Sequence, residues 1–138
     1  MMLMNKGISA IIATILLVLI AVALVGTAYL YVSGMLTGRT SKSISISDVS
    51  CTSNNITVVV SNDGTSSITN TATSKELKIF VDNVDRTSVF NESGGTNSYT
   101  IAPHSTIVLL DSTTGYSSGM HTVLVVSPSN SVRQTVYC

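Results

Sequence analysis

Few residues in this 138-residue chain are of the types that perform chemistry. Its two histidines are His104 and His121, and their spacing from the two cysteines resembles no zinc site. The chain shows no P-loop and no dinucleotide-binding fingerprint. The run Asp82–Asp85 is better explained as a hairpin turn than as a set of calcium ligands. The sequence therefore predicts a protein that is not an enzyme, with no metal site and no cofactor.

The two cysteines are Cys51 and Cys138, the last residue. In a reducing compartment they would remain free thiols, whereas beyond a membrane-targeting segment the compartment permits oxidation. A Cys51–Cys138 bridge would tie the end of the chain to the beginning of its β region and restrain a frayed C-terminus. The alternative is two unpaired thiols, with that of Cys138 exposed.

Two N-x-[S/T] sequons begin at Asn55 and Asn91. Because Ser and Thr are abundant, chance alone accounts for two such motifs among nine asparagines. Asn91 falls in a polar segment beside Gly94 and Gly95, which favours it as a glycosylation site. Asn55 opens an expected strand and is predicted to be less accessible.

Charge excludes one class of function. Seven Lys and Arg balance seven Asp and Glu, and charged residues make up 10% of the chain, against about 25% in an average soluble domain. A nucleic-acid partner needs a basic surface, which this composition does not build. No nucleic-acid binding is therefore predicted.

The strongest signal is an apolar block near the N-terminus. No charged residue lies between Lys6 and Arg39, and the middle of the block has no Pro, Asn or Gln. A bilayer core needs about 20 apolar residues of helix. The block exceeds that length, is apolar on all faces, and carries Tyr29 and Tyr31 near its outer end, where such rings favour a membrane interface.

Three interpretations of the block are open. A cleaved secretory signal has a hydrophobic region of about 7–15 residues; this one is longer, although small residues such as Ala21 and Ala23 offer a cut. A permanent single-span anchor needs only the helix itself. The third interpretation includes the short polar leader Met1–Gly7, which ends in Lys6-Gly7 just before the apolar run.

The segment from Lys6 to Ala23 resembles the N-terminus of archaeal type IV pilins. That family carries a class III signal peptide, a short basic leader that a prepilin peptidase removes before the hydrophobic helix. The resemblance implies a processing site at Lys6, Gly7 and Ile8, with cleavage between Gly7 and Ile8. It also implies that the helix, from Ile8 to about Leu36, first sits in the membrane and later packs in the core of a filament.

Some positions depart from related patterns. Bacterial type IV pilins carry a glutamate where this chain has Ile12; archaeal relatives commonly lack it, which favours the archaeal branch. Archaellins, the related motility subunits, usually begin with Gln-Ser-Gly or Gly-Ile-Glu, and neither is present here. The leader has one basic residue, Lys6.

The composition of the helix suits assembly. Small residues four apart, such as Ala23 and Thr27, let helix backbones approach closely. Gly34 and Gly38 are interpreted as the helix end and a flexible joint. The predicted polymerisation residues are Ile8, Ala10, Ile11, Ile12, Ala13, Ile15, Leu16, Val18, Leu19, Ala21, Val22, Ala23 and Gly26.

After Arg39 the sequence takes on the pattern of a β domain, in which short apolar runs alternate with turn residues. The expected strands are Ser43–Ser47, Asn55–Ser61, Glu76–Val81, Val84–Phe90, Tyr99–Ala102, Thr106–Asp111, Met120–Ser127 and Val132–Tyr137. Asp82-Asn83 is predicted as a tight hairpin turn, and Asn62–Gly64 as another turn. The segments Ser66–Ser74, Asn91–Asn97 and Ser112–Gly119 are predicted as loops.

Seven or eight short strands of this spacing match a small antiparallel sandwich of immunoglobulin-like type. The predicted class is therefore α+β, a long N-terminal hydrophobic α-helix followed by an all-β head. The predicted domains are the leader at 1–7, the assembly or transmembrane helix with its joint at 8–41, and the head at 42–138.

The leading hypothesis is a pilin, a structural subunit that polymerises through its helix into an extracellular filament for surface or cell adhesion. The resemblance implies as partners copies of the same chain, a prepilin peptidase, an assembly ATPase with its membrane platform, and the membrane before assembly. The alternative is an extracellular β-sandwich binding module on a single-span anchor that does not polymerise. A secreted enzyme or inhibitor would need a catalytic or recognition feature that the sequence does not show.

Overall fold

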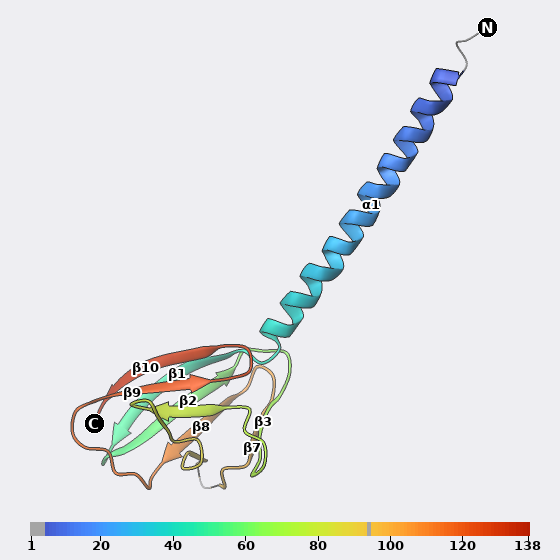
Figure 1. Ribbon diagram of the computed structural model, residues 1–138. Coiled ribbons are helices and arrows are strands. Elements are labelled where there is room, and N and C mark those ends of the chain that lie inside the picture. The colour runs from blue at the N-terminus through green and yellow to red at the C-terminus, as the bar shows by residue number, and fades with distance from the viewer. Residues whose placement is uncertain (1–4, 94) are drawn as a thin grey trace. The chain divides into compact units, whose positions relative to one another are not determined.

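The computed structural model describes residues 5–93 and 95–138, so Met1–Met4 of the expected leader lie outside the described residues. The chain divides into two units, Met1–Thr37 and Gly38–Cys138. The described part of the first unit is helical, and the second unit is built mainly of β-strands (Figure 1). The predicted α+β class, with one long N-terminal helix followed by antiparallel sheets, is confirmed.

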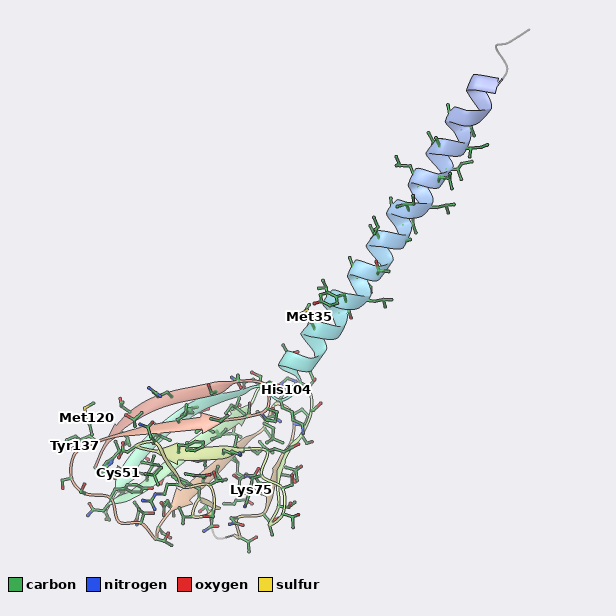
Figure 2. All side chains as sticks on the ribbon, in the orientation of Figure 1. Met35, Cys51, Lys75, His104, Met120 and Tyr137 are labelled. Atoms are coloured by element: carbon green, nitrogen blue, oxygen red, sulfur yellow. A yellow bond between two sulfur atoms is a disulfide. The ribbon has the colours of Figure 1, made fainter. Side chains whose placement is uncertain are left out.

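Helix α1 spans Asn5–Thr40 and has no acidic residue in its first turn. From Ala10 to Leu36 its side chains project on every side, and all of these residues are exposed (Figure 2). Two threonine hydroxyls of α1 are satisfied within the helix: Thr14 Oγ1 donates to the carbonyl of Ile11 at 2.8 Å, and Thr27 Oγ1 donates to that of Leu24 at 3.0 Å. This local bonding is how a threonine is accommodated in apolar surroundings.

The interpretation of Gly34 and Gly38 as the end of the helix is wrong, because α1 runs through both glycines to Thr40. That they form a flexible joint stays a prediction. A glycine inside a helix costs only about 1 kcal/mol relative to alanine. No proline follows to stop the helix, so the two glycines alone do not end it.

Two four-stranded antiparallel sheets form the head. The first sheet has the order β1-β2-β8-β6, with bounds Ile44–Thr52, Asn55–Asn62, Thr106–Asp111 and Asn91–Glu92. The second has the order β10-β9-β4-β5, with bounds Ser131–Tyr137, Met120–Val126, Lys78–Val81 and Val84–Asp85. A small third sheet pairs β3 (Ile68–Asn70) with β7 (Tyr99–Ile101).

These strand orders are those of an immunoglobulin-like sandwich. The first sheet corresponds to strands A, B, E and D, and the second to G, F and C with an added C′ strand. The immunoglobulin-like prediction therefore holds at the level of topology. The chain differs from antibody domains in having no tryptophan and no bridge between strands B and F.

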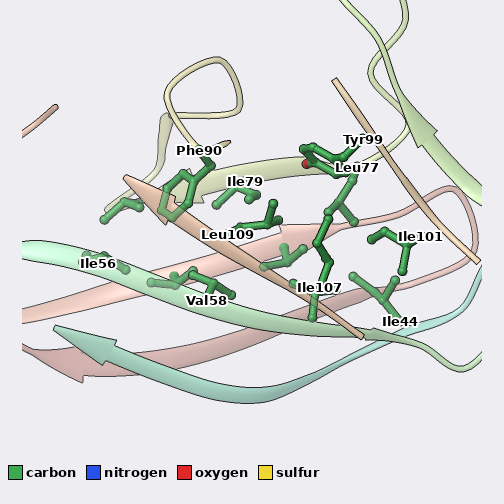
Figure 3. Close-up of a cluster of buried hydrophobic side chains, with 14 of the residues drawn as sticks. Ile44, Ile56, Val58, Leu77, Ile79, Phe90, Tyr99, Ile101, Ile107 and Leu109 are labelled. Carbon is green, nitrogen blue, oxygen red and sulfur yellow. The ribbon is translucent and has the colours of Figure 1, made fainter. Parts of the chain in front are cut away.

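The core lies between the two large sheets and is filled by alternate residues of their strands (Figure 3). In β2 of the first sheet, Ile56, Val58 and Val60 are fully buried. In β9 of the second sheet, Val123 and Val125 are fully buried as well. This period-two alternation places one face of each sheet inside. The largest fully buried side chain is that of Phe90, which lies between β5 and β6.

Two turns have the backbone that their residues predict. Asp82 and Asn83 both have positive φ, 51° and 67°, as a two-residue type I′ hairpin between β4 and β5 requires. Gly64 is required for a different reason: a Cβ at this position would lie 2.3 Å from the carbonyl oxygen of Ser41. The backbones of these two segments therefore approach as closely as only glycine allows.

One strand prediction and two loop predictions are wrong. The expected strand Val84–Phe90 ends at Asp85, because the Thr87 hydroxyl accepts the N–H of Ile79 at 3.0 Å in place of a strand partner. Strand β6 lies inside an expected loop, and so does β3. In β3, the buried Asn70 side chain bonds both the N–H and the carbonyl of Leu77, which fixes this polar segment against the core.

Candidate functional site

The first candidate site is the surface of α1. The span Ala10–Leu36 has 27 residues, its most apolar stretch of 18 residues has a mean hydropathy of 2.8, and none of that stretch is buried within the protein. At 1.5 Å per residue such a helix is about 40 Å long, against a hydrocarbon core of about 30 Å. By length and composition α1 can therefore cross a membrane.

The predicted polymerisation residues from Ala10 to Gly26 are all exposed on this surface. Lys6, Gly7 and Ile8, the predicted processing site, lie in helical backbone near the start of α1. Whether a peptidase cuts there, and whether the helix polymerises, remain predictions.

The second feature is the bridge between Cys51 and Cys138, which is present and confirms the oxidised interpretation. The sulfurs are 2.02 Å apart, the Cα atoms 5.1 Å apart, and the two residues 87 positions apart in the chain. Cys51 lies in β1, at the edge of the first sheet, and Cys138 directly follows β10, at the edge of the second. The bridge thus joins the two sheets along one side of the sandwich.

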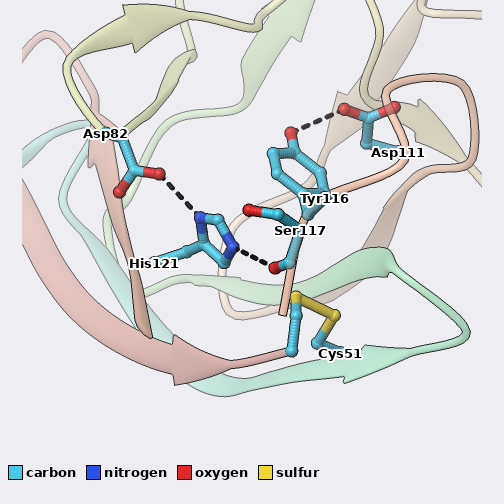
Figure 4. The surroundings of a disulfide bond; sticks show 7 residues. Cys51, Asp82, Asp111, Tyr116, Ser117 and His121 are labelled. Carbon is cyan, nitrogen blue, oxygen red and sulfur yellow. Dashed lines mark hydrogen bonds and ion pairs between the residues drawn. A yellow bond between two sulfur atoms is a disulfide. The ribbon is translucent and has the colours of Figure 1, made fainter. Parts of the chain in front are cut away.

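Near the bridge, His121 connects three segments (Figure 4). Its Nδ1 lies 2.7 Å from Oδ2 of Asp82, and its Nε2 lies 2.8 Å from the carbonyl oxygen of Ser117. Both partners are acceptors, so the two hydrogen bonds form together only when both ring nitrogens carry protons. The bond to the Ser117 carbonyl and the bond to Asp82 raise the pKa of His121.

Sequence reasoning missed this cluster and a motif within it. The residues Gly115-Tyr116-Ser117-Ser118-Gly119 have the Gly-x-Ser-x-Gly spacing of a hydrolase nucleophile elbow. That motif functions on a sharp turn from a strand into a helix, whereas here it lies between strands β8 and β9. The backbone carbonyl of Ser117, not its hydroxyl, meets Nε2 of His121. His121 therefore holds the Asp82 turn and the loop at Ser117 together, and we call these three residues the His121 clamp.

The clamp predicts a pH dependence of stability. The pKa of His121 is raised above its ordinary value of 6.5, so its contribution is complete below that pH and is lost as pH rises through the folded pKa. The bonds from the Thr122 N–H and from His121 lower the pKa of Asp82 below 3.8, so its contribution is lost as pH falls through the folded value. The clamp is therefore complete between about pH 4 and 6.5.

We expect the melting temperature of the protein to be a few degrees higher at pH 5.5 than at pH 8.5, since a half-exposed pair is worth up to about 1 kcal/mol. His121→Asn should remove most of that difference, whereas His104→Asn should leave it. Equal pH dependence of the wild type and the His121 variant in thermal melts would contradict the clamp.

Asp111, at the end of β8, is fully buried and satisfied by the loop that follows it. It accepts hydrogen bonds from the backbone and hydroxyl of Thr113, from Thr114, and from the Tyr116 hydroxyl at 2.7 Å. Burial alone would raise the pKa of Asp111, but these hydrogen bonds outweigh burial and leave the pKa lowered. A tyrosine at this corner between strands E and F is a feature of immunoglobulin-like domains, although here it bonds a side chain.

Tyr116→Phe is expected to lower the free energy of unfolding by about 2 kcal/mol, because it removes a hydrogen bond to a buried charged group. The melting temperature should fall by about 8–16 °C. Tyr137→Phe is the matched control, since Tyr137 is 71% exposed, and it should change stability by less than about 0.5 kcal/mol. A Tyr116→Phe variant that melts with the wild type would show that the corner contributes little.

Both predicted glycosylation sites belong to the first sheet. Asn91 lies in β6 and pairs with Leu110, and Asn55 opens β2 and pairs with Thr52. Both asparagines are half-buried, so the expected contrast in their accessibility is not seen. Modification of either residue remains a prediction.

Within residues 5–93 and 95–138, no three His, Cys, Asp or Glu side chains gather as a metal site would need. His104 lies in a turn with a φ of 57°, where its N–H donates to the carbonyl of Asn62. It lies apart from the His121 clamp in the sequence and serves a different turn.

No family model and no curated protein matches the chain. Among solved structures, "a putative lipoprotein (ycdA)" from Bacillus subtilis aligns with 72% of this chain at 11% identity and a TM-score of 0.36. The aligned part is 37% of that protein, so this chain spans well under half of its length. A similarity of this size carries no argument about function.

An apolar N-terminal helix followed by a disulfide-bridged β domain is the combination found in secreted or membrane-anchored extracellular proteins. The helix supplies the signal or anchor, and the bridge needs an oxidising compartment to form.

Proposed function

We propose that the chain is a pilin, the structural subunit of an archaeal type IV pilus-like filament. The observation that supports this most is the uniform apolar surface of α1 over the 27 residues from Ala10 to Leu36. A helix on the surface of a soluble protein keeps one polar side, and this one has none. It therefore needs apolar surroundings along its whole length.

Two environments meet that need, and the proposal uses both. Lipid surrounds the helix of the precursor, and copies of the same helix surround it in the filament. All backbone groups of a helix interior bond within the helix, and Thr14 and Thr27 bond their own backbone. Transfer from lipid to protein therefore leaves the backbone of the helix interior and these two threonine hydroxyls satisfied.

The implied partners follow from this use of the helix. A prepilin peptidase removes Met1–Gly7, an assembly ATPase and its membrane platform extract the helix, and copies of the chain receive it. The β head then coats the filament at the cell surface, where adhesion is its expected role. The disulfide between its two sheets suits a head in this oxidising extracellular location.

The N-terminal residue of the protein isolated from cell-surface material tests the proposal. We expect Ile8, and we expect Gly7→Asp to accumulate as uncut precursor. Asn5→Asp makes the same change of charge within the leader and should be processed normally. An intact Met1 would instead support a single-span anchored binding module, and a start beyond Ala23 would support a secreted β domain.

A further inference from the structure

The outer face of the second sheet carries one row of four side chains with opposite charges at its ends. Register pairs Arg133 of β10 with Leu124 of β9, Leu124 with Phe80 of β4, and Phe80 with Asp85 of β5. Residues paired across antiparallel strands point to the same face. The neighbours of Leu124 in β9, Val123 and Val125, are buried, so this row faces away from the core.

The apolar centre of the row keeps only part of its surface open to solvent. Leu124 and Phe80 are half-buried, yet neither belongs to the core cluster nor to the side chains packed against it. One end of the same face adds the cross-strand pair Met120 and Tyr137, 72% and 71% exposed (Figure 2). Both sequons lie on the other sheet, so glycans at those positions would leave this face clear.

The charged ends of the row are exposed, and the charge of Asp85 also interacts with that of Lys78 in the same chain. Arg133 and Asp85 are both exposed, and neither takes part in an ion pair among the described residues. Asp85 accepts the N–H of Thr87 at 2.9 Å. Lys78, on the same face in β4, adds a second positive charge one step along the strand from this row.

We propose that two copies of this chain pair face to face through their second sheets. A two-fold axis that lies in the interface parallel to the strands reverses the order of the row in one copy relative to the other. Arg133 of each copy then faces Asp85 of its partner, and Leu124 faces Phe80. An isologous contact of this kind requires a self-complementary surface, and the order of charges and apolar residues supplies one.

The pairing is compatible with the rest of the chain and does not depend on the pilin proposal. Because the axis is parallel to the strands, the N-terminal ends of both β1 strands lie at the same end of the pair. Two membrane-inserted chains or two neighbouring parallel filaments can therefore pair in this way. Stable interfaces bury about 800 Å² on each partner. The row places only two half-buried apolar side chains between its charged ends, so we expect a weak pair favoured by high local concentration.

The test uses the full chain in detergent micelles, with Arg133→Glu and Asp85→Lys made separately. In either variant both charge pairs of the dimer become like-charge contacts, and self-association measured by sedimentation should fall at least about tenfold. When the two variants carry different tags and are mixed, both charge pairs are restored in the heterodimer. We expect the mixture to recover association to within about threefold of the wild type.

Asp48→Lys is the matched control, because Asp48 is exposed on the first sheet and pairs with Val59. It should associate like the wild type. Asp85→Asn keeps an acceptor for the Thr87 N–H but removes the charge. We expect this variant to associate more weakly than the wild type, which would show that the loss of charge, and not misfolding, is responsible. A wild type that stays monomeric, an Arg133→Glu variant that associates normally, or a mixture that does not recover would each overturn the proposal. Association through α1 would respond to none of these head variants.

Discussion

Replacing Ala23 with aspartate is expected to lower the amount of the protein in filaments about 100-fold. Ala23 lies at the centre of the apolar span Ala10–Leu36. A charged residue at the centre of a membrane helix costs about 3 kcal/mol by insertion measurements, and an unpaired carboxylate in a packed helical core has no better solvation. The measurement is quantitative immunoblotting of sheared filaments against total protein.

Two matched substitutions separate the causes. Ala23→Ser keeps the small size, and its hydroxyl can bond the helix backbone, so it should assemble normally. Ala23→Leu suits lipid but widens the helix at a small residue, so it should remain in the membrane and assemble less if helices approach closely there. Normal filaments from Ala23→Asp would contradict a core role for α1 and return the helix to the function of a plain anchor.

Removal of the disulfide by Cys51→Ser is expected to destabilise the head by about 4 kcal/mol. The bridge closes a loop of 87 residues, and chain-entropy models assign roughly that free energy to a loop of this length. For a domain of about 100 residues the melting temperature should fall by about 15–30 °C. Thermal melts of the full chain in detergent measure the change.

The double variant Cys51→Ser/Cys138→Ser provides the control, since it removes the bridge without leaving an unpaired thiol. It should melt like the single variant and like the wild type in excess dithiothreitol. A fall below about 1 kcal/mol in all three would show that the contact between β1 and β10 holds the two sheets together without the bridge.

The helix and the turns of the head are local features, and the sequence predicted them. A charge-free run from Gly7 to Gly38 leaves no solvated side for a helix. Asp82-Asn83 tolerates positive φ and so defines the hairpin between β4 and β5. The end of α1 was predicted less well, because Gly34 and Gly38 weaken a helix without stopping it.

The errors in the head arise where a side chain replaces a strand partner. Thr87 accepts the N–H of Ile79 and ends β5 after Asp85, although the residues up to Phe90 have the pattern of a strand. Asn70 does the opposite and anchors a polar segment as β3. The hydrophobic pattern of the sequence predicts neither hydrogen bond, because each one depends on a partner that folding brings close.

The same reason explains the functional features that sequence reasoning missed. His121 and Asp82 are 39 positions apart and meet only because β4 and β9 pair. Tyr116 reaches Asp111 across a loop whose composition suggested only a surface segment. The Gly-x-Ser-x-Gly spacing in that loop lies between two strands and not between a strand and a helix, and this context is known only from the folded structure.

The sequence by itself determined the apolar helix, the β-sheet class of the head and the two cysteines able to form a bridge. These features can be read from composition and from the spacing of residues that are close together in the chain. Tertiary structure alone decided that the bridge joins two sheets, that His121 is held by Asp82, and that Arg133, Leu124, Phe80 and Asp85 form one row. The packing of the two sheets brings the cysteines together. Strand register sets the other two features, and register is a property of the folded pairing of distant segments.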